Sequence, residues 1–338
     1  MNAQTDLRNA QDNKRSFLAR NKLAIIGILI LAVIAAYMLQ ERYLATILNF
    51  ICIYTIAVTG LDLLFGYTGQ VSFGHAGFYA IGAYTSALLS KNLGLPALLT
   101  IFLGAIVATI FGIIIAFPAA RLVKHFLSLL TIAFGMMVYT YVNSAQITNG
   151  PSGIVSIPKV SIFGFELADN KYYFILVLII VIGCIVAKYN IINSRVGRAF
   201  IAVRENPHAA AGMGIDVAKY KIMAFAISAF MAGIAGALYT HMVRFISPDT
   251  FTTTQSNMFM TMLLFGGIAT IPGALIGAAA ITIMTELLQQ FAAYQSLIYA
   301  ALILVVLFLL PNGTVGLFTK IRNAMRKKMQ AKEGKEHV

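Results

Sequence analysis

The feature that most constrains this chain is a series of apolar runs, several of about 18 residues or more, long enough to cross a hydrocarbon core about 30 Å thick. Of its 338 residues, 59% are hydrophobic and only 11% are charged. Because lipid offers the backbone no hydrogen-bond partners, each span must be a helix or part of a closed barrel. The runs are continuous rather than alternating in polarity, which favours helices. The sequence therefore predicts an all-α, polytopic membrane protein.

The apolar runs predict ten transmembrane helices. They lie at about residues 23–39, 44–65, 71–90, 96–117, 125–147, 172–189, 220–243, 257–271, 272–292 and 295–310. The first run resembles the apolar core of a signal peptide, but Glu41 and Arg42 follow it in place of a cleavage site, and we interpret it as a retained span. The predicted organisation is a tail at 1–22, a transmembrane domain at 23–312 that contains a cytoplasmic loop at 190–219, and a basic tail at 313–338.

The distribution of basic residues predicts the orientation. With the amino terminus inside, 20 of the 25 Lys and Arg residues fall in predicted cytoplasmic segments, as the positive-inside rule requires. This count assigns Lys188 to a cytoplasmic segment at 188–221. The net charge of +13 is then mainly a topology signal, and we expect no nucleic-acid partner. Both termini are predicted to be cytoplasmic.

Motifs that would indicate an enzyme are missing from the sequence. It contains no G-x-x-x-x-G-K-[ST] phosphate loop, so any ATP dependence must come from a partner. It also lacks a nucleophile elbow and an H-E-x-x-H motif. Cys52 and Cys184 fall inside predicted spans, and no metal-type Cys/His spacing occurs. We predict no enzymatic activity, no catalytic residue, no cofactor and no metal.

An ion-coupled secondary carrier is the alternative from another functional class. Such a carrier usually needs ionisable groups near the middle of the membrane. Of the twelve acidic residues only Asp62 and Glu286 lie inside apolar runs, both near span ends, where we expect them to reach interfacial water. This position weakens the carrier hypothesis but leaves it open, because Asp62 can still pair with a residue on a neighbouring helix.

Residues 63–89 interrupt the apolar pattern with glycines and polar side chains. Each glycine lowers helix propensity by roughly 1 kcal/mol relative to alanine, and a broken span frees backbone groups that only protein or water can satisfy. Interrupted helices mark the substrate region of many transporters. The path candidates are Gly69, Gln70, Ser72, Gly74, His75 and Gly77. In the alternative interpretation, the glycines only admit neighbouring helices, and the His or Ser bonds one helix to another.

A second interrupted region repeats part of the first. The segment Leu263–Gly277, "LLFGGIATIPGALIG", contains the LLFG of Leu63–Gly66 and then breaks at Gly267 and Pro272. Two corresponding breaks suggest an internal duplication. The small residues of Gly273-x-x-x-Gly277 and Ala229-x-x-x-Gly233-x-x-x-Ala237 fit packing seams between helices.

The predicted cytoplasmic loop contains a short helix between two clear boundaries. Asn206 is typical of an N-cap, Pro207 of the first helical residue, and Gly214 of a left-handed stop after a helix at 208–213. Ala209, Ala210 and Ala211 would let another surface approach this helix closely. Alternatively, the helix lies on the membrane surface, which the neighbouring Arg195, Arg198 and Arg204 would also suit.

Several segments resemble signatures of the branched-chain amino acid ABC transporter permeases, of the LivM type. The matching segments, which follow one another in order through most of residues 44–290, are "GLDLLFGYTGQ" at 60–70, "SFGHAG" at 72–77, "GAY" at 82–84, "SLLTIAFGMM" at 128–137, "TNGPSGI" at 148–154 and "YKIMAFAISAFMAGIAGALY" at 220–239. The element at 150–154 is more similar to LivM than to its LivH partner.

The resemblance implies that the loop is an EAA-like coupling segment seated in a groove of an ATP-hydrolysing subunit. Ala209, Ala210 and Gly214 match the A-A-x-x-x-G core, and His208 stands where an acid is usual. The candidate coupling residues are Arg204, Glu205, Pro207, Ala209, Ala210 and Gly214. The resemblance also implies a second, LivH-like permease subunit, two ATP-binding subunits and an extracytoplasmic solute-binding protein, all at the bacterial inner membrane.

The sequence therefore predicts a permease subunit that passes a small polar solute inward by alternating access. Branched-chain amino acids are the substrates that the resemblance implies. Related permeases for urea, amides, other amino acids or sugars are the alternatives, and an ion-coupled secondary carrier is the alternative from another class.

Overall fold

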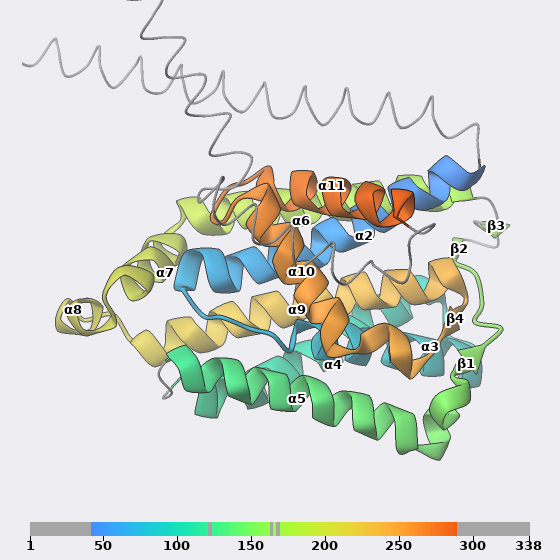
Figure 1. The fold of residues 1–338 in the computed structure, drawn as a ribbon, viewed down its shortest axis with the longest axis horizontal. Helices are drawn as coiled ribbons and strands as arrows, with labels where there is room; N and C mark the ends of the chain where they lie inside the picture. The colour runs from blue at the N-terminus through green and yellow to red at the C-terminus, as the bar shows by residue number, and fades with distance from the viewer. Residues whose placement is uncertain (1–41, 121–123, 163–164, 167–169, 289–338) are drawn as a thin grey trace, which may run out of the picture. The chain divides into compact units, whose positions relative to one another are not determined.

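The computed structural model describes residues 42–120, 124–162, 165–166 and 170–288. These residues form a bundle of helices with short connecting strands (Figure 1). The chain divides into two units, 1–48 and 49–338, and the arrangement described below is that of the second. The predicted spans at 23–39 and 295–310 and both terminal tails lie outside the described residues.

The helices follow one another with short connections. They are α2 (Arg42–Leu61), α3 (His75–Asn92), α4 (Ala97–Ala119), α5 (Lys124–Ser144), α6 (Asn170–Asn193), α7 (Arg195–Glu205), α8 (Pro207–Gly212), α9 (Val217–Val243), α10 (Thr253–Gly266) and α11 (Gly273–Leu287). The helix α2 continues directly into a π-helix, η1 (Asp62–Tyr67), and short 3₁₀ helices occur at η2 (Gln146–Thr148), η3 (Gly150–Ser152) and η4 (Pro248–Phe251).

Two small antiparallel pairs of strands complete the described chain. The strand β1 (Ile154–Val155) pairs with β4 (Phe245–Ile246), and β2 (Ser161–Ile162) pairs with β3 (Phe165–Glu166). The first pair connects the segment before α6 with the segment after α9. It lies at the opposite end of the bundle from α7 and α8 (Figure 1).

Five helices of the described chain are long and apolar enough to cross a membrane. They are Tyr43–Tyr67, Ala97–Ala119, Phe126–Ser144, Tyr172–Asn193 and Val217–Val243, and each coincides with a predicted span. The protein is therefore a multi-pass, all-α membrane protein. The predicted spans at 257–271 and 272–292 correspond to the shorter α10 and α11, of 14 and 15 residues. A total of ten spans and the internal duplication stay predictions.

Small residues bring α3, α4 and α9 into close contact at the centre of the bundle. A Cβ on Gly82 of α3 would overlap the carbonyl oxygen of Gly233 of α9, and one on Gly104 of α4 would lie 2.7 Å from the Gly82 oxygen. Ala229, Gly233 and Ala237 are all buried, so the predicted seam along α9 is confirmed. The seam on α11 is confirmed too, because Gly277 leaves no room for a Cβ against Met262 of α10.

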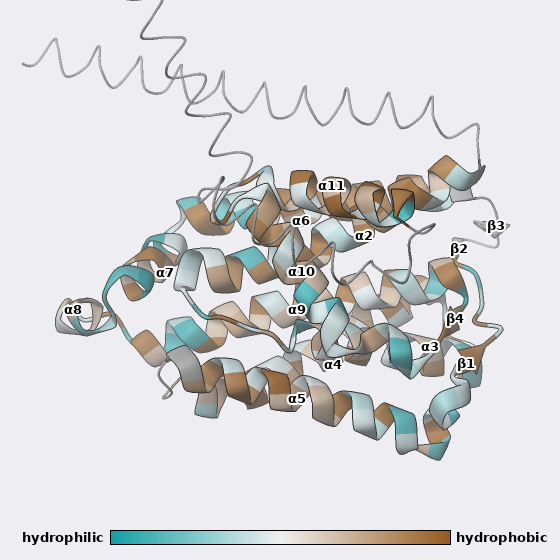
Figure 2. Cartoon of the chain, in the orientation of Figure 1, coloured by the Kyte–Doolittle hydropathy of each residue, from teal (hydrophilic) through white to brown (hydrophobic). Residues whose placement is uncertain are grey.

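Large apolar side chains lie on the exposed faces of α4, α5 and α6. These include Phe102, Ile110 and Phe117 of α4, Met136, Met137 and Tyr141 of α5, and Ile175, Ile179 and Val186 of α6. Figure 2 shows brown, hydrophobic residues along the middle of α5 and teal, hydrophilic residues at α7. An apolar exterior between polar ends is what a hydrocarbon layer requires of a bundle that crosses it.

Candidate translocation and coupling site

The first glycine-rich break comprises residues 66–77, and its centre is an irregular segment at 68–74. This segment follows η1 and ends where α3 begins at His75. The backbone N–H of Phe73 donates to Thr131 Oγ1 of α5 at 3.2 Å, and that of Ala76 donates to Ser256 Oγ of α10 at 2.9 Å. Hydroxyl groups from two other helices thus satisfy backbone groups at the break, and neither partner was predicted from the sequence.

Three polar side chains of the break are buried, and each has one polar atom without a hydrogen-bond partner among the described residues. Within the described chain, Gln70 Oε1, Ser72 Oγ and His75 Nδ1 have no hydrogen-bond partner. His75 Nε2 lies 3.1 Å from the carbonyl oxygen of Ala57, which can only accept, so Nε2 carries the proton and Nδ1 is left as an acceptor. Such atoms are exceptional in folded proteins, and each calls for an explanation.

The glycines of the break lie at contacts between helices. A Cβ on Gly74 would overlap the carbonyl oxygen of Thr131, and one on Gly77 would lie 3.0 Å from the Phe134 ring of α5. Gly69 has a φ of +70° and faces the side chain of Arg204. Close packing, the alternative interpretation of these glycines, accounts for Gly74 and Gly77.

The predicted N-cap, first residue and glycine stop of the short helix α8 are confirmed. The Asn206 side chain caps it, with Oδ1 accepting from the backbone N–H groups of His208 at 3.0 Å and Ala209 at 3.1 Å. Pro207 is its first residue, and Gly214 follows it with a φ of +80°. The helix ends at Gly212, one residue earlier than predicted.

The predicted alanine face of α8 is wrong at one position. Ala209 and Ala211 are exposed, but Ala210 is only 4% exposed. The chain reverses after Gly214, and the Ile215 N–H donates to the Ala210 carbonyl oxygen at 3.0 Å, so this side of α8 faces the protein itself. Met213 is 83% exposed and was missed as a candidate, although a large apolar side chain beside a glycine stop was a visible signal.

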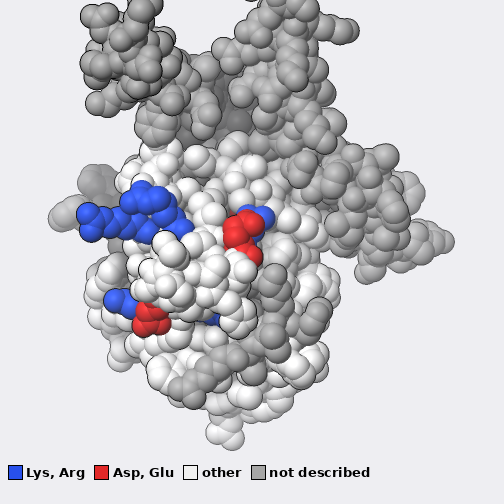
Figure 3. Space-filling model, turned by 90° about the vertical axis from the view of Figure 1, so that its left-hand side faces the viewer, with Lys and Arg blue, Asp and Glu red and all other residues white. Residues whose placement is uncertain are grey.

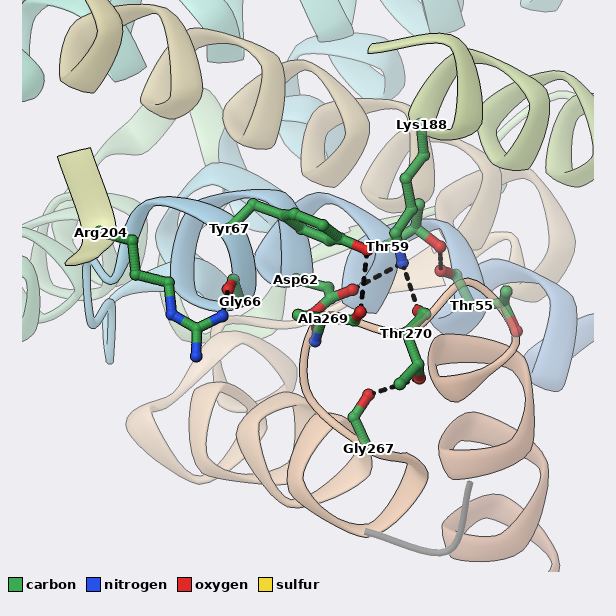
Figure 4. Close-up of polar contacts among 10 residues, drawn as sticks. All are labelled: Thr55, Thr59, Asp62, Gly66, Tyr67, Lys188, Arg204, Gly267, Ala269 and Thr270. Carbon is green, nitrogen blue, oxygen red and sulfur yellow. Dashed lines mark hydrogen bonds and ion pairs between the residues drawn. The ribbon is translucent and has the colours of Figure 1, made fainter. Parts of the chain in front are cut away.

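The two candidate regions meet at one place. Arg204 Nη1 of α7 donates to the carbonyl oxygen of Gly66 at 2.6 Å (Figure 4). The Arg204 side chain also lies against Gly69. Figure 3 views this end of the molecule and shows blue basic and red acidic side chains on a mostly uncharged surface. Nothing in the sequence pattern predicted that the segment at 193–221 contacts the first break.

The prediction that Asp62 reaches interfacial water is wrong. Its side chain is 0% exposed and forms an ion pair at 2.6 Å with Lys188, which is also 0% exposed. The possibility that Asp62 pairs with a neighbouring helix is thereby confirmed. Lys188 is not a loop charge as counted, because it lies within α6 and the 267–270 turn bonds to it. A lone lysine near the end of the apolar run at 172–189 was its only signal.

The described chain shows no group of three or more His, Cys, Asp or Glu residues that could hold a metal ion. Cys52 and Cys184 are both buried, free thiols.

The family model described as "Branched-chain amino acid transport system / permease component" matches residues 43–307. This chain belongs to that family. The permease is 30% identical to the high-affinity branched-chain amino acid transport system permease protein LivM of Escherichia coli (strain K12), over 92% of this chain and 80% of the relative. The family is one of transport permeases rather than enzymes, and the LivM-type resemblance is confirmed.

More distant relatives include both permease types. The chain is 27% identical to LivH of Salmonella typhimurium, over 83% of this chain and 96% of the relative. It is 24% identical to the probable LivM protein of Methanocaldococcus jannaschii, over 86% of this chain and 99% of the relative. No solved structure gives a significant match.

Proposed function

We propose that this permease moves branched-chain amino acids inward by alternating access, as one of two membrane subunits of an ABC importer. The observation that carries the proposal is the family match across residues 43–307. The contact between Arg204 and the first break supports it, because it joins the segment proposed to dock on an ATPase to the region proposed to line the path. Urea, amides, other amino acids and sugars are the competing substrates.

The proposed complex contains four further proteins, which are of three kinds. Similarity to both LivM and LivH proteins supports a second, LivH-like permease subunit. One of two ATP-binding subunits would dock on α8, and an extracytoplasmic solute-binding protein would deliver the solute to the opposite end. We place the permease in the bacterial inner membrane, with ten spans and both termini in the cytoplasm.

Within the path we assign the central role to the polar side chains of the first break rather than to its glycines. Gln70, Ser72 and His75 each carry a buried atom that lacks a partner in the described chain, so a polar solute can replace water there without breaking a protein bond. Gly74 and Gly77 would keep α5 close to this segment.

The ion-coupled carrier is the weaker hypothesis. Asp62 is the buried carboxylate of the described residues, and both of its oxygens are engaged, by Lys188 and by the Ala269 N–H. A carboxylate held in this way is not available to bind and release a coupling ion without breaking the bonds that fix the turn at 267–270.

Met213→Glu is expected to weaken docking of the ATPase and to abolish solute-stimulated ATP hydrolysis. Met213 is 83% exposed, so the change leaves the fold intact while placing an unpaired charge in the proposed dry contact. The measurements are co-purification of the ATP-binding subunits and leucine-stimulated ATP hydrolysis in proteoliposomes with the binding protein. The competing substrates are tested in the same assay in place of leucine.

The matched control is Leu93→Glu, which adds the same charge at a residue 65% exposed at the end of α3. That end lies away from α8, so ATPase co-purification should stay at the wild-type level. Undiminished co-purification by Met213→Glu, or uptake by the wild-type permease alone driven by an ion gradient, would count against the proposed function.

Cysteine labelling is expected to place α8 and the α3 end on opposite sides of the membrane. In intact cells an impermeant maleimide should modify Leu93→Cys but not Met213→Cys, and both after permeabilisation, as the distribution of basic residues implies. The native Cys52 and Cys184 are 5% and 8% exposed, so their background is low. Labelling of Met213→Cys in intact cells would overturn the orientation.

A further inference from the structure

A buried cluster of charges joins three separate parts of the permease. Asp62 lies where α2 passes into η1, and its Oδ2 is 2.6 Å from Lys188 Nζ of α6. Asp62 Oδ1 accepts from the Ala269 N–H at 2.7 Å, and Lys188 Nζ also donates to the Thr270 carbonyl oxygen at 2.9 Å (Figure 4). Both charged side chains are 0% exposed, so their bonds are made to protein alone.

The partner of this ion pair is the turn at 267–270, which lies between α10 and α11. The turn is held at three backbone atoms: the Ala269 N–H by Asp62, the Thr270 oxygen by Lys188, and the Ala269 oxygen by the Tyr67 hydroxyl at 2.9 Å. Ala269 has a φ of +56°, which is unusual for a residue with a side chain. Contacts from outside the turn therefore determine where the turn lies.

Arg204 of α7 bonds to a residue packed against the same turn. The Gly66 carbonyl oxygen accepts from Arg204, and a Cβ on Gly66 would overlap Asp62 Oδ1 and lie 2.9 Å from the Ala269 nitrogen. A single residue of η1 thus touches Asp62, the turn and α7. Any displacement of α7 that carries Arg204 with it acts directly on the residue packed against the turn.

The other end of α10 reaches the first break. Ser256 of α10 accepts from the Ala76 N–H at 2.9 Å, and the Phe259 ring packs edge-on against His75 with 6.1 Å between ring centroids. The helix between Ser256 and the turn is continuous, so a shift of the turn is passed along α10 to the side chains beside His75.

We propose that Asp62, Lys188 and Arg204 are positioning residues that form a hairpin latch, which transmits movement of α7 and α8 to the α10–α11 hairpin and through α10 to the first break. The inference rests on the proposed function, in which an ATPase moves α8. A buried ion pair is poor evidence of added stability, because apolar residues of similar volume often do as well. Its directional bonds fix one position of the turn, which is what a transmitting contact requires.

The test compares two exposed arginines of α7. Arg204→Gln removes the bond to Gly66, whereas Arg198→Gln removes the same charge from an exposed position of the same helix. The readout is the modification rate of a half-buried turn residue, Ile268→Cys, by a small thiol reagent in the full complex, without solute, before and after trapping with ATP and vanadate.

In the wild-type background and in Arg198→Gln, trapping is expected to change the modification rate about fivefold or more, within the usual range of coupling between sites. In Arg204→Gln the ATPase should remain bound, the rate should no longer respond to trapping, and ATP-driven uptake should fall about tenfold. A wild-type rate that ignores trapping, or equal responses of the two arginine variants, would overturn the latch.

A second variant tests the ion pair itself. The double change Asp62→Asn and Lys188→Met keeps an acceptor for the Ala269 N–H but removes both charges and the bond to Thr270. We expect an assembled complex whose turn is modified rapidly in both states. A response to trapping like that of the wild type, or a double variant that does not assemble, would reduce the pair to a structural role. This readout needs no solute, so it is unaffected if the proposed substrate is wrong. An ATPase that does not bind the wild-type permease would contradict the proposed function rather than the latch.

Discussion

Lys188→Met is expected to leave little folded permease in the membrane. The change leaves the Asp62 carboxylate 0% exposed with its counter-charge gone, and breaking a buried pair from one side costs about 3–5 kcal/mol. That is a large share of the free energy of unfolding of folded proteins, which is roughly 5–15 kcal/mol. The measurements are the yield of monodisperse permease and its thermal unfolding in detergent.

Two variants make this result interpretable. Lys219→Met removes an exposed lysine from the first turn of α9 and should leave yield and unfolding close to wild type. The double change Asp62→Asn and Lys188→Met should recover most of the loss, since no unpaired charge remains buried. If Lys188→Met were as stable as Lys219→Met, the pair would contribute nothing to the folded state.

Gly82→Ala is expected to destabilise the bundle, while the same substitution at Gly183 stabilises it slightly. A Cβ at Gly82 would overlap the backbone of Gly233 on α9, and overpacking of this kind costs about 1–3 kcal/mol. Gly183 of α6 is exposed, and no described atom lies within 4 Å of an added Cβ, so alanine there gains helix propensity of up to about 1 kcal/mol. Thermal unfolding of the two purified variants makes the comparison.

The decisive result is the difference in sign. Equal effects of the two substitutions would mean that α3 and α9 can move apart without loss of stability. The small residues of the α9 seam would then not be needed for packing. A loss confined to Gly82→Ala would support the central position of these helices.

The parts of the fold that could be predicted from the sequence are those with local causes. Hydropathy located the five long apolar helices because lipid imposes a length and a composition on each helix separately. Asn206, Pro207 and Gly214 defined α8 because capping depends on neighbouring backbone groups. Gly267 and Pro272 likewise defined the break between α10 and α11.

The contacts at the candidate site depend on residues far apart in the chain, and the sequence pattern did not predict them. A lysine at the end of an apolar run usually extends to the membrane surface, so Lys188 was counted as a loop charge. Its burial depends on the turn at 267–270, which comes much later in the chain. Ala210 was misplaced because the composition of a six-residue helix does not tell which side faces its own protein.

The glycines of the first break show why composition alone left two interpretations. A small residue serves equally to admit a neighbouring helix and to open a path, so only the surroundings distinguish the two. At Gly74 the surroundings are the backbone of Thr131. At Gln70 they include a buried oxygen for which the described chain offers no donor.

The order of Asp62, Lys188 and the turn along the chain has a consequence for biogenesis. A growing chain emerges from its amino terminus, so Asp62 enters the membrane first, Lys188 later, and the turn that bonds to both comes last. Until the turn is synthesised, each charge lies near the end of its helix, where a long lysine stem can still reach water. We expect the hairpin of α10 and α11 to be the element that removes this pair from water. In nascent chains halted before residue 267, Lys188 should therefore react with amine-modifying reagents, and in chains that include the hairpin it should not.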